Sequence, residues 1–180
     1  MKDNTAVKIL GFIVRLSVLC AAAGLLLSYV YKVTKPGIEA QKVRAVNEAM
    51  KEVLPEAVEF RENENGVLSG YDGNAAMVGR VMQSQERGYG GPVKVMVGVD
   101  PGDRILGVKV LEHYETPGLG DAVTRDSFLK QFGGMEIGQV GLVKDRGEVN
   151  AVTGATISSK ACVAAVKKAL AVLPGGISDE

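Results

Sequence analysis

The sequence predicts an α+β protein in which a single N-terminal transmembrane helix precedes a small mixed α/β domain. Two patterns within its 180 residues predict this class. An uncharged apolar run at residues 16–31 is typical of a membrane helix. Alternating valines in residues 93–111, followed later by a helical apolar stripe in residues 158–173, indicate a sheet packed against a helix. We therefore divide the chain into a membrane anchor, residues 1–35, and a folded domain, residues 36–180.

The N-terminal apolar segment is long enough to cross a membrane. Residues 9–33 carry charges only near their two ends, and a hydrocarbon core requires about 20 apolar residues. A cleavable signal peptide ending at residues 21–23 is a weaker alternative, because apolar sequence continues through Leu27. Lipid attachment at Cys20 is also weaker, since Leu19 stands where a small residue would be needed.

The charges argue against a nucleic-acid partner, but they do not show which way the helix crosses the membrane. Basic residues flank the apolar segment on both sides, and a long C-terminal domain can cross a membrane regardless of them. The whole chain has 21 basic and 21 acidic side chains and a pI near 6.6. Such a chain lacks the positive field of a nucleic-acid-binding protein.

The two cysteines and one histidine are too few ligands for a zinc site of the Cys and His type, so we predict no metal site. Cys20 lies in the membrane segment and Cys162 in a distant helical stretch. We therefore expect no disulfide between them.

The folded domain is expected to contain both helices and strands. An apolar stripe predicts a helix over residues 38–54, which Pro55 ends and which could continue into the membrane helix with a kink at Pro36. A hairpin is expected at Val93–Val99 and Ile105–Leu111 around the turn of residues 100–103, with its valines on one half-buried face. The remaining expected elements are strands at 57–60, 67–71 and 76–83, a short helix at 126–132 capped by Asp126, and a final helix at 158–173.

The segment Asn150–Ser159 is the strongest candidate for a binding site. Its small residues, Gly154 and Ala155, would let the backbone approach a ligand closely. Its hydroxyl side chains lie at the start of a helix, where free amides favour an anion such as phosphate. The alternative is that these residues only cap the helix. The hydroxyl residues are Thr153, Thr156, Ser158 and Ser159.

A second candidate loop follows the hairpin and has the sequence Glu115-Thr116-Pro117-Gly118-Leu119-Gly120. The proline fixes the backbone and the two glycines permit tight turns, so the loop could lie rigidly against a flat ring. An ordinary turn is the alternative. A third glycine-dense stretch spans Arg87–Pro92. His113 has no nearby nucleophile in the sequence, and we predict no catalytic residue.

Together these motifs resemble the flavin-binding domain family, and specifically the G subunits of Rnf-type ion-translocating electron-transport complexes. The resemblance covers nearly the whole chain, through Gly88–Val93, Glu115–Gly120 and Thr153–Ala161 in this order. It implies that a flavin transferase attaches FMN through its phosphate to the hydroxyl of Thr156. It also implies that the residues of both candidate loops contact the cofactor, with residues 115–120 near the isoalloxazine ring.

The same resemblance implies a function and a location. The chain would be a single-pass cell-membrane protein whose domain lies on the extracytoplasmic side. There it would relay electrons among the subunits of an ion-pumping ferredoxin:NAD oxidoreductase. The transferase motif commonly has an aspartate where this chain has Asn150, which keeps the shape of the side chain but not its charge.

Two alternatives from different classes stay open at the level of sequence. The C subunit of the sodium-pumping NADH:quinone oxidoreductase shares the flavin-threonine motif but is usually longer. A membrane-anchored binding or sensory domain without flavin would use the residues around Thr156 only as a helix cap. A self-sufficient reductase is disfavoured, because the chain has no fingerprint for a nucleotide such as GxGxxG.

Overall fold

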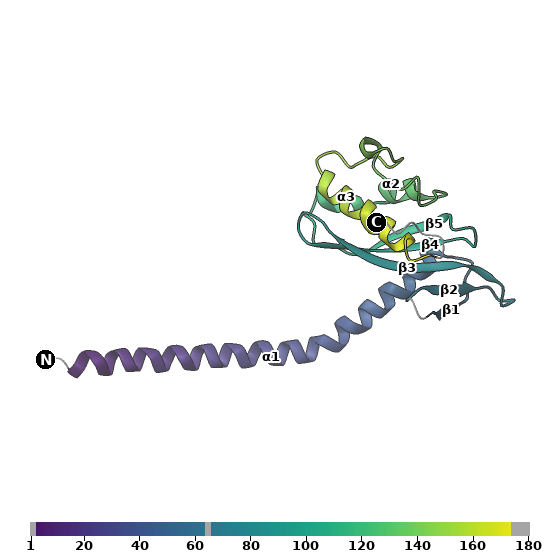
Figure 1. Ribbon diagram of the computed structural model, residues 1–180. Helices are drawn as coiled ribbons and strands as arrows, with labels where there is room; N and C mark the ends of the chain where they lie inside the picture. The colour runs from purple at the N-terminus through teal and green to yellow at the C-terminus, as the bar shows by residue number, and fades with distance from the viewer. Residues whose placement is uncertain (1–2, 64–65, 174–180) are drawn as a thin grey trace. The chain divides into compact units, whose positions relative to one another are not determined.

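The computed structural model describes residues 3–63 and 66–173 (Figure 1). Two compact units divide the chain at Arg44 and Ala45. The first unit consists of the N-terminal part of helix α1 (Asp3–Val53), and the second contains the end of α1 and every later element. The predicted combination of a long apolar helix and a small α+β domain is confirmed.

Helix α1 joins the expected membrane helix and the expected helix at residues 38–54 into one element, with Pro36 inside it. The helix is long and apolar enough to span a membrane. Its large apolar side chains lie uncovered along the first unit, where Leu25 and Leu27 are 74% and 72% exposed. Water is an unfavourable environment for so much apolar surface, which suits a lipid-facing helix.

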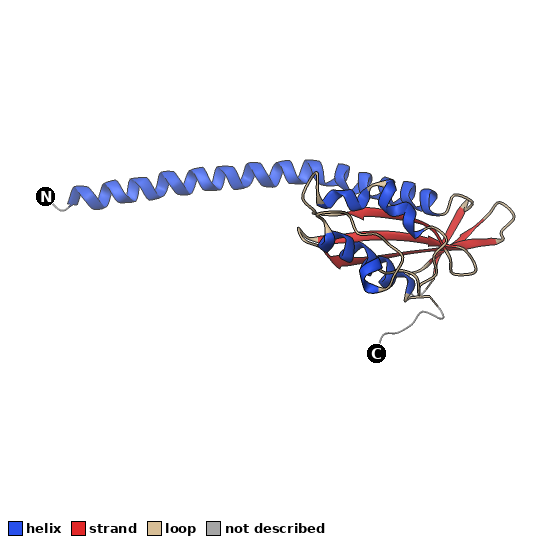
Figure 2. Cartoon of the chain, turned by 90° about the horizontal axis from the view of Figure 1, so that it is seen from above, coloured by secondary structure: helices blue, strands red, loops and turns tan. Residues whose placement is uncertain are grey.

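The second unit is built on a five-stranded antiparallel sheet with the order β1-β2-β3-β4-β5, as labelled in Figure 1. Figure 2 shows the strands in red. Each strand pairs with its neighbour in sequence, as in a meander. The expected hairpin is confirmed, with Val97 opposite Val108 in its middle. The strand expected at 76–83 is longer than predicted and ends at Arg87. The strands are β1 (Glu59–Glu62), β2 (Leu68–Tyr71), β3 (Met77–Arg87), β4 (Pro92–Val99) and β5 (Ile105–Glu112).

The expectation of a half-buried strand is wrong for β4, because both faces of this strand are covered. Val93, Val95, Val97 and Val99 of β4 pack under helix α3 (Thr156–Leu170) in the larger core. Met96, which points to the opposite face, belongs to a second core formed with the end of α1. All five of these side chains are fully buried. Figure 1 shows α3 lying along the sheet on the face opposite the end of α1.

Four glycines let the end of α1 lie directly against the second face. They form two cross-strand pairs, Gly70 with Gly79 and Gly98 with Gly107. A Cβ on Gly98 would lie 2.3 Å from the carbonyl oxygen of Val53, and one on Gly70 would lie 2.5 Å from a methyl group of Leu54. We call these four residues the glycine patch.

The segment between β5 and α3 consists of short helical turns and packs into the larger core through Phe128 and Phe132. It contains α2 (Asp126–Leu129) and three 3₁₀ turns at Gly120–Thr124, Lys130–Phe132 and Val143–Asp145. The expected cap at Asp126 is wrong. Arg125 takes the N-cap position with extended backbone, and Asp126 is the first helical residue, 3.2 Å from the Lys130 ammonium.

The last helix begins two residues earlier than expected, at Thr156. It packs on β3 and β4, and the Ser84 hydroxyl donates a hydrogen bond to the Ala165 carbonyl. Cys162 is fully buried in this interface, and burial raises its pKa to about 12. Cys20 and Cys162 are both free thiols.

Candidate functional site

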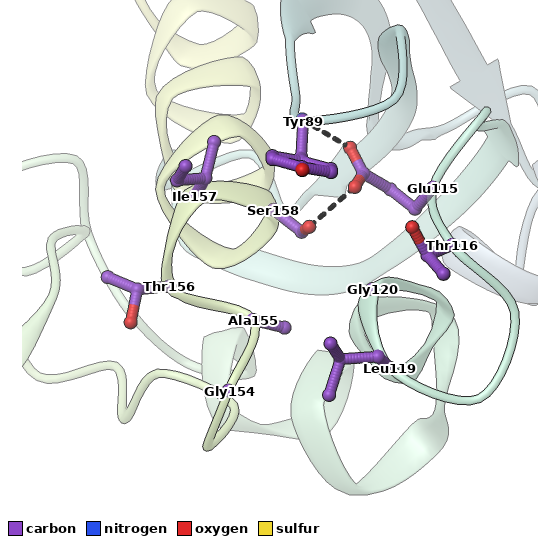
Figure 3. A pocket seen from close by; sticks show the side chains of 10 residues that line it. All are labelled: Tyr89, Glu115, Thr116, Leu119, Gly120, Gly154, Ala155, Thr156, Ile157 and Ser158. Carbon is purple, nitrogen blue, oxygen red and sulfur yellow. Dashed lines mark hydrogen bonds between the residues drawn. The ribbon is translucent and has the colours of Figure 1, made fainter.

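Three segments that are distant in sequence meet around one pocket of about 540 Å³ (Figure 3). They are the turn between β3 and β4, the loop that follows β5, and the start of α3. Pockets that hold small molecules and cofactors usually measure about 300–1,000 Å³. The residues that line the pocket are Tyr89, Glu115, Thr116, Leu119, Gly120, Gly154, Ala155, Thr156, Ile157 and Ser158.

Glu115 links the three segments through its carboxylate. One oxygen accepts a hydrogen bond from the backbone N–H of Tyr89 at 2.9 Å, and the other accepts one from the Ser158 hydroxyl at 2.6 Å. Figure 3 shows both bonds converging on this side chain. The residue is only 4% exposed. Since a buried carboxylate is costly unless it is hydrogen-bonded, these two donors are needed to keep it in place.

Glycines clear the space that this carboxylate occupies. A Cβ on Gly88 would lie 1.8 Å from Glu115 Oε1, and one on Gly120 would lie 2.9 Å from Glu115 Oε2. The two other glycines of the β3–β4 turn lie against Tyr114. A Cβ on Gly90 would lie 1.9 Å from its carbonyl oxygen, and one on Gly91 would lie 2.7 Å from its Cβ. The glycine-dense turn and the loop after β5 therefore pack backbone against backbone.

The two candidate loops contact each other through matching turns. Gly118 and Gly154 both have a positive φ, +80° and +79°, in the third position of a four-residue turn. The Thr116 carbonyl accepts from the Leu119 N–H, and the Val152 carbonyl accepts from the Ala155 N–H. This is the arrangement of a type II turn, in which glycine avoids backbone strain. The Leu119 side chain lies against Gly154, because a Cβ on this glycine would lie 3.0 Å from Leu119 Cδ1.

The start of α3 is free to receive an anion. Its N-cap is Ala155, which has no side chain able to cap, so simple capping does not explain the hydroxyl residues. Ser159 is fully buried and instead braces the preceding turn, since its hydroxyl accepts a hydrogen bond from the Val152 N–H and donates one to the Ala155 carbonyl. Thr156 is the first helical residue and is exposed. The first backbone N–H groups of a helix lack intrahelical partners and favour negative charge.

Apolar side chains surround the mouth of the pocket. Tyr89, Ile157 and Leu119 are 72%, 55% and 49% exposed. Figure 3 shows Tyr89 and Ile157 on one side and Leu119 on the other. A flat apolar ring could be covered by these side chains while an attached anion lies at the start of α3. The pocket thus suits a ligand that combines an aromatic ring with a phosphate.

Most of the residues expected from the sequence line this pocket, and Thr153, Pro117, Gly118 and Ser159 do not. The last three shape or brace the two turns, and Thr153 lies exposed between Val152 and Gly154. The sequence did not identify Tyr89 or Ile157 as lining residues, although the glycines beside Tyr89 marked its turn as unusual.

Asn150 lies outside the pocket and pairs with Gln131. Its backbone N–H donates to the Gln131 side-chain oxygen at 2.8 Å, and its own side-chain NH₂ donates to the same oxygen at 3.2 Å. An aspartate at this position would lose the second donor.

Gly88→Ala is expected to destabilise the domain by about 2 kcal/mol, as overpacking of a filled site usually does. The added methyl group would displace the Glu115 carboxylate from the Tyr89 N–H. Thermal unfolding measured by circular dichroism would report the loss. Gly73→Ala is the matched control, because no atom lies within 4 Å of its added Cβ. Equal unfolding temperatures for the two variants would contradict the close packing of Gly88 on Glu115.

The chain matches one protein family and is similar to several known proteins. The FMN-binding domain family matches residues 88–171, a range that contains all three pocket segments. The chain is 32% identical to the G subunit of the proton-translocating ferredoxin:NAD(+) oxidoreductase complex of Clostridium ljungdahlii, over 94% of each chain. It is 34% identical to the G subunit of the ion-translocating oxidoreductase complex of Methanosarcina acetivorans, over 88% of this chain and 90% of that one.

A solved structure is also similar to the chain. It is the C subunit of the Na(+)-translocating NADH-quinone reductase from Parabacteroides distasonis, with a TM-score of 0.52 and 21% identity over 63% of each chain. At this identity the likeness concerns the fold alone.

Proposed function

Because the chain belongs to the family of G subunits of Rnf-type ion-translocating oxidoreductase complexes, we propose that it carries FMN covalently on Thr156 and relays electrons within such a complex. The family match and the similar G subunits confirm the resemblance inferred from the sequence. The chain is an electron-transfer flavoprotein subunit with an FMN-binding domain.

The residues of the pocket fit FMN. The flavin supplies the redox chemistry, since its ring accepts and donates electrons one or two at a time. Tyr89, Ile157 and Leu119 would cover the ring, and the first amides of α3 would bind the phosphate. The left-handed backbone at Gly154 lets this turn lie close to the ligand.

One observation supports Thr156 as the attachment point. Its hydroxyl is exposed at the start of α3 and forms no hydrogen bond within the described part of the chain. The hydroxyls of Ser158 and Ser159 are buried and already hydrogen-bonded. No base forms a hydrogen bond with the Thr156 hydroxyl in the described residues, so a separate flavin transferase would have to make the phosphoester bond.

The rest of the proposal concerns the membrane. Residues 1–35 would anchor the subunit, and residues 36–180 would form the FMN-binding domain on the extracytoplasmic side. Its partners would be the other subunits of the complex, with ferredoxin and NAD as the ultimate donor and acceptor. A covalent link would keep the cofactor in place on a side of the membrane where it is not replenished.

The C subunit of the sodium-pumping NADH:quinone oxidoreductase is a weaker assignment. Its support is a likeness of fold at 21% identity, whereas G subunits align over nearly the whole chain. A flavin-free sensory domain is not supported, because the FMN-binding domain family covers all three pocket segments.

Mass spectrometry of the tryptic peptide 147–160 tests the proposal. The full chain would be purified after coexpression with a flavin transferase. The expected result is a peptide heavier by one FMN phosphoester, with fragment ions that place the addition on Thr156. An unmodified peptide, or a modification on Thr153, would refute the assignment.

A further inference from the structure

We propose that Glu115 lowers the midpoint potential of the flavin by placing beside the pocket a negative charge that has no ion-pair partner among the described residues. This inference depends on the proposed function, since it requires FMN in this pocket. It concerns the negative charge of the Glu115 carboxylate. The role of this side chain in joining the three segments requires only its hydrogen bonds.

The two donors around Glu115 suit an ionised carboxylate. One oxygen accepts from the Tyr89 N–H, and the other lies within hydrogen-bond distance of the Ser158 hydroxyl. An ionised carboxylate can only accept, so both groups can act as its donors. The 2.6 Å distance between Ser158 Oγ and Glu115 Oε2 falls in the range typical of an O–H group bound to a carboxylate.

Glu115 forms no ion pair with the described residues. Within residues 3–63 and 66–173, no lysine or arginine nitrogen lies within 4.0 Å of the Glu115 carboxylate, although nine other ion pairs form in the same part of the chain. Glu115 as a whole is only 4% exposed, so water screens its carboxylate poorly. A charge in such surroundings acts over a longer distance than one on the surface.

The field of this carboxylate acts on the occupant of the pocket, which Glu115 helps to line. Adding an electron to that occupant brings a second negative charge close to the first. The repulsion makes reduction less favourable and lowers the midpoint potential. Only a strongly reducing donor would then reduce the flavin, and the flavin would pass its electron on readily.

Glu115→Gln removes the charge with little change in shape. The amide oxygen can still accept from the Tyr89 N–H, and the amide NH₂ can donate to the Ser158 oxygen. The matched control is Glu112→Gln, which removes an exposed carboxylate that accepts from the Tyr114 hydroxyl.

Spectroelectrochemical titration of the full-length flavinylated chain measures the effect. Glu115→Gln is expected to raise the midpoint potential by about 59 mV, which corresponds to a tenfold change in a one-electron equilibrium. Glu112→Gln should leave the potential unchanged. A Glu115→Gln potential equal to that of the wild type would overturn the inference, while the flavin present in both proteins would leave the proposed function standing.

Glu115→Asp provides a second test, which applies even if Glu115→Gln fails to retain flavin. It keeps the negative charge and shortens the side chain by one methylene group. The expected potential is close to that of the wild type. A rise as large as the tenfold effect expected for Glu115→Gln would contradict the inference, because the shift would then follow from lost packing and not from lost charge. A wild-type chain without flavin would refute both the inference and the proposed function.

Discussion

Thr156→Ala is expected to abolish covalent flavin attachment completely. The variant should lose the fluorescent band that flavinylated protein gives on a denaturing gel. The neighbouring hydroxyls cannot replace it, because Ser158 donates to Glu115 and Ser159 is fully buried and bonded to the Ala155 carbonyl. A complex assembled with this variant should fall to background ferredoxin-to-NAD activity, since its relay would be missing.

Two variants serve as controls for this result. Thr156→Ser keeps a hydroxyl at the first position of α3 and should retain at least part of the fluorescence. Thr153→Ala removes the other exposed hydroxyl of the segment and should leave the band intact. A fluorescent band in Thr156→Ala that disappears in Thr153→Ala would move the attachment to the earlier threonine.

Gly98→Ala is expected to destabilise the folded domain by about 3 kcal/mol, the upper part of the usual range for overpacking. The added Cβ would lie 2.3 Å from the carbonyl oxygen of Val53 and 3.0 Å from its Cβ. Backbone atoms cannot rotate away as a flexible side chain would, so α1 or β4 would have to move. For a domain of this size the unfolding temperature should fall by roughly 10 °C.

Differential scanning calorimetry of the full chain in detergent would measure this shift. Gly138→Ala is the matched control, because its Cβ would have no atom within 4 Å. Its unfolding temperature should remain within a few degrees of the wild type. If Gly98→Ala unfolded at the same temperature as the control, the end of α1 would not pack on the glycine patch as described.

Local patterns in the sequence were sufficient to predict most of the elements. The β4–β5 hairpin was predictable because alternating valines and a turn with proline and glycine are local signals. The burial of Met96 was not, because it depends on residues at the end of α1 that lie more than 40 positions earlier. The sequence therefore suggested a half-buried sheet, and the second core was missed.

The candidate site could also be predicted only as far as local sequence patterns reach. The glycine-rich motifs marked the correct loops, since glycine density signals tight turns or close approach. The sequence could not show that Glu115 receives a hydrogen bond from the Tyr89 backbone, because a backbone donor leaves no mark on residue identity. Asp126 failed as a cap because its backbone is already helical, which depended on the extended conformation of Arg125.

The meander order of the sheet has a consequence for the timing of maturation. Each strand pairs with the one made just before it, so the sheet can form progressively while the chain is being synthesised. Helix α3 is made later and must fold back onto β3. The hydrogen bond between Ser84 and Ala165 joins residues that are 81 positions apart in the sequence. Thr156 sits on this helix, so the pocket is complete only after α3 has been synthesised. An enzyme that reads the assembled pocket would therefore act after this helix has folded back onto the sheet.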